Sequence, residues 1–226
     1  MVDDWYGNTA IYTAVTTDFE YMGKNRFQEG IDYIFFTDGS SKPIQDTWRV
    51  EKLPDLSHLH PRRAAKLPKV NPHFFDILTK YKYTIWIDGD MQIIGDNFAP
   101  DILSYMDEGV LFSPHFDGRD CAYSEATIRP LKYVSEPLDQ QVEFYKQDGF
   151  PENLGLFEGG IIARDMTNRD VRELGQVWYI QNMVFSYQDQ VSLPYVLWKT
   201  KIKYSVLPKS FRDFEWVVIN AHKREE

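Results

Sequence analysis

The sequence predicts an α/β fold with a largely parallel central sheet flanked by helices. Short β-branched and aromatic runs, each ending in a polar turn, alternate along the chain with segments of helical character. Residues 83–87, Y-T-I-W-I, are almost wholly apolar, which is the pattern of a strand buried on both faces of a parallel sheet. The 226 residues contain no internal repeat or flexible linker, so we expect one domain over residues 1–226.

The first expected elements follow from local composition. Residues 10–15 (A-I-Y-T-A-V) and 33–37 (Y-I-F-F-T) have the β-branched and aromatic character of strands. A short helix is expected between them, within residues 18–29. The Asn71-Pro72 pair matches an N-cap followed by proline at the first helical position, and it predicts a helix over residues 72–81.

The rest of the chain continues the alternation of strands and helices, which is typical of a parallel sheet covered by helices. The remaining expected elements are strands at residues 83–87, 110–113, 156–163, 201–207 and 216–220, and helices at residues 98–106, 122–134, 140–147, 168 onward and 190–199.

Composition excludes several classes of function. The chain has 34 acidic and 25 basic residues, a net charge of −9, and no concentrated basic face of the kind that nucleic-acid binding requires. The single cysteine, Cys121, excludes an intramolecular disulfide and a multi-cysteine metal site. No apolar run approaches the roughly 18 residues of a membrane span, and the start of the chain lacks signal-peptide features. We therefore expect a soluble, cytoplasmic protein, or one domain of a larger polypeptide.

An acidic pair follows the most hydrophobic strand. In α/β sheets, ligands bind beyond the carboxyl ends of the strands, and Asp88-Gly89-Asp90 comes directly after residues 83–87. Gly89 allows the backbone to turn, so that both carboxylates can converge on one divalent cation, directly or through water. The alternative is a pair of solvated turn aspartates.

Three further segments carry candidate binding groups. Residues 62–69, R-R-A-A-K-L-P-K, place Arg62 and Lys66 on one helical face, which suits a diphosphate beside a metal or is simply a solvated basic face. The Gly159-Gly160 pair opens a strand and either allows close approach of a ligand or forms a turn. Asp189 stands at the start of an expected helix, where it is either functional or a plain N-cap.

These segments, taken in order, carry a family resemblance. The first strand ending in A-V-T, the R-x-x-K stretch, I-W-I-D-G-D, E-G-G-I and the D-Q helix start resemble GT-A glycosyltransferases related to glycogenin and the bacterial galactosyltransferases. The segments R-R-A-A-K-L-P-K-V-N-P-H-F-F, R-D-C-A-Y-S-E-A, Q-V-E-F-Y and D-Q-V-S-L-P-Y-V-L-W are more closely similar to a glycosyltransferase-like family with plant, bacterial and viral members.

The resemblance implies a single GT-A-type, Rossmann-like domain that transfers a hexose or deoxyhexose from a nucleotide sugar, most often a UDP-sugar, to a glycan or protein-linked acceptor. It places the turn after the first strand against uracil and ribose and a basic pair against the diphosphate. The residues expected to bind the nucleotide sugar are Thr13, Ala14, Val15, Thr16, Asp38, Arg63, Lys66 and Asp88.

The same resemblance implies a metal site and a carboxylate near the anomeric carbon. Asp88 and Asp90 are the expected metal ligands, with His222 as the third ligand and His115 in reserve. A histidine nitrogen favours Mn²⁺ over Mg²⁺. Asp189 is the first candidate for the catalytic carboxylate and Glu158 the second, in an order typical of the retaining enzymes.

One departure and several alternatives accompany this interpretation. Glycogenin relatives end in an H-x-G-x-x-K-P-W motif, whereas only A-H-K-R is found here, at residues 221–224. The main alternative is a catalytically inactive module that binds a nucleotide sugar or glycan. A haloacid dehalogenase-type phosphatase is disfavoured because Gln92 follows the acidic pair, and a nucleotidyltransferase because its G-x-G-T-R loop is absent. The donor sugar, the acceptor and the oligomeric state are left open.

Overall fold

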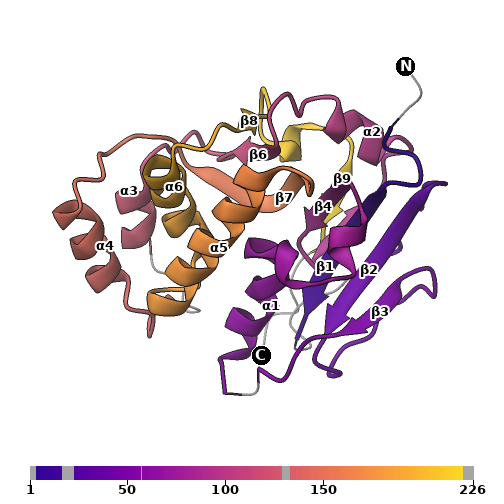
Figure 1. Cartoon of the computed structure of the whole chain (residues 1–226), viewed down its shortest axis with the longest axis horizontal. Helices are drawn as coiled ribbons and strands as arrows, with labels where there is room; N and C mark the ends of the chain where they lie inside the picture. The colour runs from indigo at the N-terminus through magenta and orange to yellow at the C-terminus, as the bar shows by residue number, and fades with distance from the viewer. Residues whose placement is uncertain (1–3, 17–22, 57, 129–132, 221–226) are drawn as a thin grey trace.

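A computed structural model describes residues 4–16, 23–56, 58–128 and 133–220, and its core is a mixed α/β arrangement around a central sheet (Figure 1). Within the described residues the sheet has seven strands in the order β3-β2-β1-β4-β7-β6-β8, and a two-stranded sheet of β5 and β9 lies apart from it. The strands are β1 (Thr9–Val15), β2 (Ile31–Thr37), β3 (Arg49–Lys52), β4 (Tyr83–Ile87), β5 (Met91–Ile93), β6 (Val110–Pro114), β7 (Phe157–Asp165), β8 (Ser205–Val206) and β9 (Val217–Ile219).

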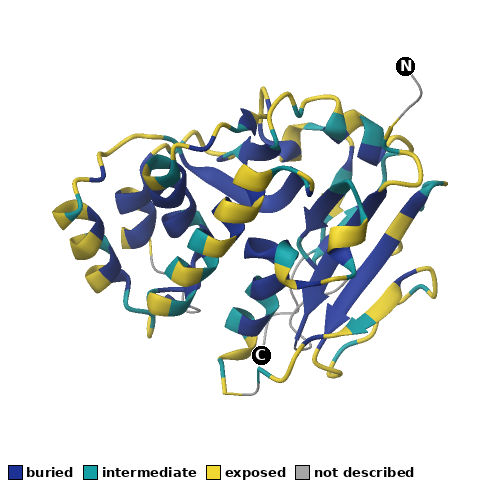
Figure 2. Cartoon of the chain, viewed as in Figure 1, coloured by how far each residue is buried: buried dark blue, intermediate teal, exposed yellow. Residues whose placement is uncertain are grey.

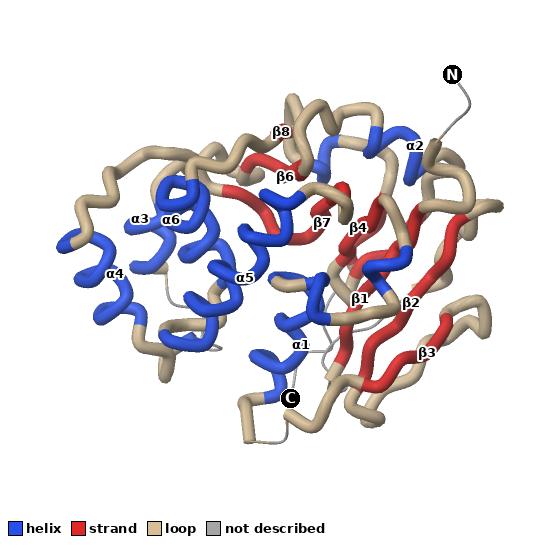
Figure 3. The backbone as a smooth tube through the Cα atoms, in the orientation of Figure 1, coloured by secondary structure: helices blue, strands red, loops and turns tan. Residues whose placement is uncertain are grey.

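Helices flank the sheet, and most of them gather beside α1 and around β7 (Figure 3). The helices are α1 (Pro61–Val70), α2 (Phe98–Leu103), α3 (Ala122–Thr127), α4 (Leu138–Gln147), α5 (Arg169–Val184) and α6 (Asp189–Thr200), with short 3₁₀ turns η1 (Pro72–Phe74), η2 (Leu78–Lys80) and η4 (Phe211–Asp213). None of the described helices is both long and apolar enough to cross a bilayer.

The direction of β7 decides what meets at the carboxyl end of β4. Strands β3, β2, β1 and β4 are mutually parallel, whereas β7 runs antiparallel to both β4 and β6. Ile87, the last residue of β4, therefore pairs with Ile161 in the middle of β7, and the first half of β7 extends past the end of β4. As a result, the Gly159-Gly160 pair lies beside the Asp88 turn, although it begins a strand instead of ending one.

Two hydrophobic cores pack on the two faces of the sheet, which explains the apolar strands (Figure 2). In β1 the alternate residues Ala10, Tyr12 and Ala14 face the core formed with α1, α5 and α6. Ile11 and Val15 face the other core, which is covered by α2 and the C-terminal segment. A strand that is apolar on both faces is buried on both, as the sequence of residues 83–87 predicted.

The helix expected at residues 72–81 is not found there, and the α-helix of this region is α1, which ends at Val70. The Nδ1 atom of His60 accepts the Arg62 N–H, and Pro61 occupies the first helical position. The pattern of an N-cap followed by proline therefore occurs at His60-Pro61 instead of at Asn71-Pro72. Asn71 ends this helix, because a residue that precedes proline disfavours helical geometry. Residues 72–81 consequently form only the two turns η1 and η2.

Other element predictions were confirmed with shifted bounds, and two need correction. Residues 23–29 contain no helix, and the remainder of the expected helix at 18–29 falls largely outside the described residues. Strand β3 was not predicted, because its sequence, R-V-E-K, is mostly charged; it is an exposed edge strand. Helix α3 ends at Thr127, short of residue 134, and β8 covers only two residues of the expected 201–207 strand.

Gly160 tests how closely β7 packs against the segments beside it. A Cβ atom at this position would overlap Met91 Cε and would lie 2.7 Å from Phe211 Cζ. Gly160→Ala should therefore lower the free energy of unfolding by about 1–3 kcal/mol through overpacking. Urea titration measures the change, and equal stability of the two proteins would show that the packing here is loose.

Candidate active site

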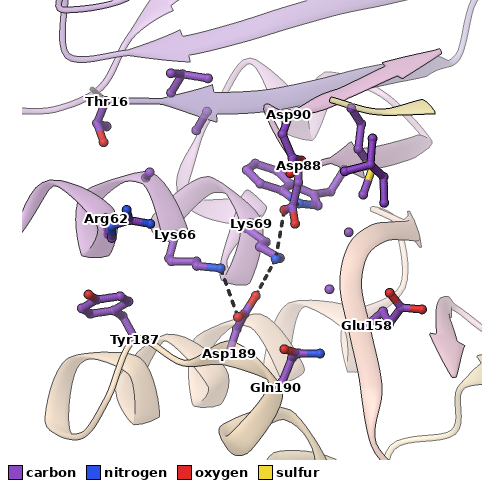
Figure 4. Close-up of a pocket in the computed structure, with 18 of the residues that line it drawn as sticks. Thr16, Arg62, Lys66, Lys69, Asp88, Asp90, Glu158, Tyr187, Asp189 and Gln190 are labelled. Atoms are coloured by element: carbon purple, nitrogen blue, oxygen red, sulfur yellow. Dashed lines mark hydrogen bonds and ion pairs between the residues drawn. The ribbon is translucent and has the colours of Figure 1, made fainter. Parts of the chain in front are cut away.

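The candidate active site is a pocket at the carboxyl ends of β1 and β4, closed on its sides by α1, the start of β7 and the start of α6 (Figure 4). Ala14, Val15 and Thr16 form its β1 wall. The other described residues that line it are Arg62, Ala65, Lys66, Lys69, Trp86, Asp88, Asp90, Met91, Tyr133, Glu158, Gly159, Gly160, Tyr187, Asp189, Gln190, Phe211, Arg212 and Ile219.

The acidic pair after β4 is held by the backbone on both sides. The Asp88 N–H donates to the Gly160 carbonyl at 3.0 Å, and the Asp90 carbonyl accepts the Asn220 N–H at 2.8 Å. Asp88 Oδ1 accepts hydrogen bonds from Trp86 Nε1 at 2.8 Å and from Lys69 Nζ at 3.1 Å. No described residue donates to Oδ2 of Asp88, so this oxygen is available to a ligand in the pocket.

Lys69 connects the acidic pair to α6. The residue is only 1% exposed, and its Nζ atom lies 3.1 Å from Asp88 Oδ1 and 2.5 Å from Asp189 Oδ2. Lys66, one turn earlier on α1, lies 3.0 Å from Asp189 Oδ1 (Figure 4). Lys69 therefore joins a carboxylate at the end of β4 to one at the start of α6, and Lys66 also pairs with the second of these. We call Lys66 and Lys69 the lysine bridge.

Asp189 is ionised despite its burial. Desolvation works against the charged form, but the charges of Lys66 and Lys69 and their hydrogen bonds outweigh it and hold the pKa of Asp189 well below its usual range. A carboxylate of this kind is a weak proton acceptor and a strong fixed negative charge. The simple N-cap role does not account for this carboxylate, because Asp189 is the first residue of α6 and both its oxygens face lysines.

The lysine bridge explains the glycine at position 159. A Cβ atom there would lie 2.6 Å from Lys69 Nζ and 2.8 Å from Asp189 Oδ2. Any side chain would therefore push into the contact between these two groups. Gly159 gives the β7 backbone close access to the charged floor of the pocket.

Glu158 is engaged with the C-terminal segment. Its Oε1 accepts the Ser210 hydroxyl at 2.5 Å, and its Oε2 accepts Arg212 Nε at 2.6 Å. The guanidinium of Arg212 also stacks at 4.6 Å over the ring of Phe116. Glu158 thus orients Arg212, which lines the pocket and whose terminal nitrogens make no hydrogen bond to the described residues.

Several residues predicted from the sequence lie away from the pocket. Thr13 is buried within the sheet, and Asp38 is exposed and accepts hydrogen bonds from Ser40. Arg63 points away from the lining, toward Glu136 and the Phe185 carbonyl. The basic residues of α1 that line the pocket are Arg62, Lys66 and Lys69. Their spacing places them on one helical face, and this spacing could have identified Lys69 from the sequence.

The two histidine candidates are not part of the described lining. His115 is buried, and its Nδ1 atom lies 2.5 Å from Asp117 Oδ1. His222 falls outside the described residues. Arg212 was missed because no local motif connects residue 212 to the pocket; hydrogen bonds of its neighbours to distant strands, Ser210 to Glu158 and Phe211 to Ser113, hold its segment there.

The pocket fits a divalent cation in a limited way. Among the described residues, no group of three or more His, Cys, Asp or Glu side chains could hold a metal ion. Asp88 and Asp90 both line the pocket, however, and Asp88 Oδ2 has no donor there. Two carboxylates completed by substrate phosphate oxygens are an ordinary donor set for Mg²⁺-type cations.

Asp189 also makes stability depend on pH. Its pKa is lower in the folded protein than in the unfolded chain, so its stabilising contribution is complete above about pH 4 and disappears as pH falls. Asp189→Asn should lower the free energy of unfolding by about 1–3 kcal/mol at pH 7, since Lys69 keeps Asp88 as partner. Urea titrations from pH 2 to 7 should show the two proteins converging in acid; a constant difference would contradict the assignment.

Comparison with known proteins identifies a plant relative of this chain. A curated relative, the "Probable hexosyltransferase MUCI70" of Arabidopsis thaliana, is 27% identical over 194 residues, which cover 79% of this chain. The match covers 33% of that plant protein, so the chain corresponds to about a third of its length.

The sequence model of one family matches most of the chain. It is described as "TOD1/MUCI70, glycosyltransferase-like domain" and matches residues 37–224, which include β3 to β9 and most of the pocket. The expectation of a glycosyltransferase-like family with plant members is confirmed. The chain belongs to the TOD1/MUCI70 glycosyltransferase-like domain family.

Proposed function

We propose that this protein is a metal-dependent glycosyltransferase that moves a hexose from a nucleotide sugar, most simply a UDP-sugar, to a glycan or protein-linked acceptor. The observation that carries the proposal is the convergence of Asp88, Asp90, the lysine bridge and Asp189 in one pocket at the carboxyl end of the sheet. Membership of a glycosyltransferase-like family and the name of the plant relative support the same class of reaction.

The nucleoside is proposed to lie at the β1 wall, where Ala14, Val15 and Thr16 reach the pocket. Thr16 is anchored there, because its hydroxyl donates to the Pro61 carbonyl at 2.9 Å. This contact joins the end of β1 to the start of α1, and so keeps the nucleoside wall and the cationic helix face in a fixed relation. Backbone groups supply most of the polar contacts in this proposal.

The diphosphate is proposed to lie among Arg62, Lys66 and Arg212, with the cation on Asp88 and Asp90. Arg212 offers the paired N–H groups that bind phosphate oxygens in a bidentate manner. When bound, Mn²⁺ or Mg²⁺ neutralises charge that develops on the leaving diphosphate. The basic side chains share this task, and Glu158 keeps Arg212 pointing toward the phosphates.

Asp189 is proposed to face the donor sugar. Glycosyl transfer passes through an oxocarbenium-like state, which a fixed negative charge stabilises. The lowered pKa of Asp189 suits this role and makes the residue a poor general base. Glu158 is similarly committed to Ser210 and Arg212. These properties favour a retaining reaction, in which the leaving phosphate assists the acceptor.

The metal site is tested through Asp90. A panel of nucleotide sugars with and without Mn²⁺ should first identify a donor by the rise in Tm and by release of the nucleotide. Asp90→Asn should then lower Mn²⁺-dependent turnover by on the order of 100-fold, because a charged ligand is lost. Asp96→Asn, an exposed partner of Arg26, is the matched control and should be unaffected.

Two outcomes of that panel would contradict the proposal. Saturable binding with no release of sugar in any condition would identify a nucleotide-sugar-binding module without catalysis. Full activity of Asp90→Asn with unchanged metal dependence would remove the acidic pair from the reaction.

The stereochemical course is tested on the product. Proton NMR of the first product formed should show the same anomeric configuration as the donor sugar, because the described pocket supplies fixed charge in place of a free base. The coupling constant of the anomeric proton distinguishes the two configurations. An inverted product would require a base that accepts the proton of the acceptor hydroxyl, and it would contradict the retaining course.

A further inference from the structure

The loop between α5 and α6, residues 185–188, leads directly into Asp189 and is held by four polar side chains that are buried or mostly buried. These are Arg63 from α1, Glu125 from α3, Glu136 from the turn before α4, and Gln141 from α4. We call these four residues the loop clamp. Three of them, Arg63, Glu125 and Gln141, lie within motifs that the sequence singled out, and the proposed reaction gives none of these three residues a role.

Arg63 and Glu136 bind the backbone of the loop. Both terminal nitrogens of Arg63 donate to the Phe185 carbonyl at 3.0 Å, and its Nη2 lies 2.7 Å from Glu136 Oε2. The same Glu136 oxygen accepts the Tyr187 N–H at 2.9 Å. The ion pair of Arg63 and Glu136 therefore binds the loop backbone on both sides of Ser186, at Phe185 and at Tyr187.

Gln141 and Glu125 bind the loop residues Ser186 and Gln188. Gln141 Oε1 accepts the Ser186 hydroxyl at 2.6 Å and the Ser186 N–H at 3.3 Å. Glu125 Oε1 accepts Gln188 Nε2 at 2.9 Å, and its other oxygen contacts Arg119. Gln141, Ser186 and Gln188 are almost completely buried, so these bonds form at a large cost in desolvation that an ordinary helix–helix loop does not need.

We propose that the loop clamp is the positioning device of the active site: it fixes the start of α6 so that the Asp189 carboxylate meets Lys66 and Lys69 at the donor sugar. The inference rests on the proposed role of Asp189. Helix α1 supplies both parts, because Arg63 holds the loop while Lys66 and Lys69 hold the carboxylate. Clamp residues touch no substrate and act through Asp189.

The test compares Glu136→Leu with a control on the same pair of helices. Asp148 joins the end of α4 to Tyr195 and Lys199 in the later part of α6. Asp148→Asn therefore removes a carboxylate that contacts α6 away from Asp189. Glu136→Leu should lower kcat by on the order of 10–100-fold with little change in donor KM, since small misplacement of a catalytic group is costly. Asp148→Asn should leave kcat unchanged, and Glu136→Gln should retain intermediate activity.

A second background separates positioning from general loss of structure. In Asp189→Asn protein, adding Glu136→Leu should lower the residual kcat no further, because a residue that acts through Asp189 has nothing left to position. The fall in Tm caused by Glu136→Leu should persist in that background. Additive losses of kcat in the double variant would overturn the proposal, as would an unchanged kcat in Glu136→Leu.

Hydrogen exchange gives a measurement that needs no activity. Glu136→Leu should speed exchange at the amides of the first turn of α6, and Asp148→Asn should do so only at its last turn. If the protein transfers no sugar but this pattern is found, the proposed function fails while the loop clamp remains. Uniform exchange along α6 in Glu136→Leu protein would overturn the clamp itself.

Discussion

The buried ammonium of Lys69 is the constraint on which the pocket depends. A lysine that is 1% exposed requires carboxylate partners, because an unpaired charge in the interior costs several kcal/mol. Its partners come from two separate elements, the end of β4 and the start of α6, so three elements must converge on one nitrogen. Gly159 is the steric counterpart of this convergence, since a side chain there would occupy the space that the ion pairs need.

The antiparallel strand β7 allows this convergence within a mostly parallel sheet. Parallel strands deliver only their carboxyl ends to the ligand edge, whereas β7 delivers its start. The two glycines and Glu158 thereby reach the same edge as Asp88. Strand β6, which pairs with the other side of β7, leads to the segment of His115 to Arg119 that supports Glu125. The pocket and its support thus follow from one reversal of strand direction.

Local patterns in the sequence predicted the elements and the acidic pair, but contacts between distant residues were beyond them. The buried strand at residues 83–87 and the turn after it were predicted from apolar composition and spacing alone. Arg63 and Lys66 were predicted as a diphosphate-binding pair, yet Arg63 pairs with Glu136 and Lys66 with Asp189. The partner of Lys69 and the presence of Arg212 in the pocket required knowledge of which segments meet, because each residue is paired with one far away along the chain.

The charges of the pocket explain why donor and cation would bind together. In a chain of net charge −9, the described lining holds four basic side chains, Arg62, Lys66, Lys69 and Arg212, and four carboxylates, Asp88, Asp90, Glu158 and Asp189. This balance is formally neutral. A diphosphate alone would add two negative charges to a partly desolvated site, and a divalent cation alone would add two positive ones. Bound together they preserve the balance, so the electrostatics of the pocket favour the metal–diphosphate complex over either component.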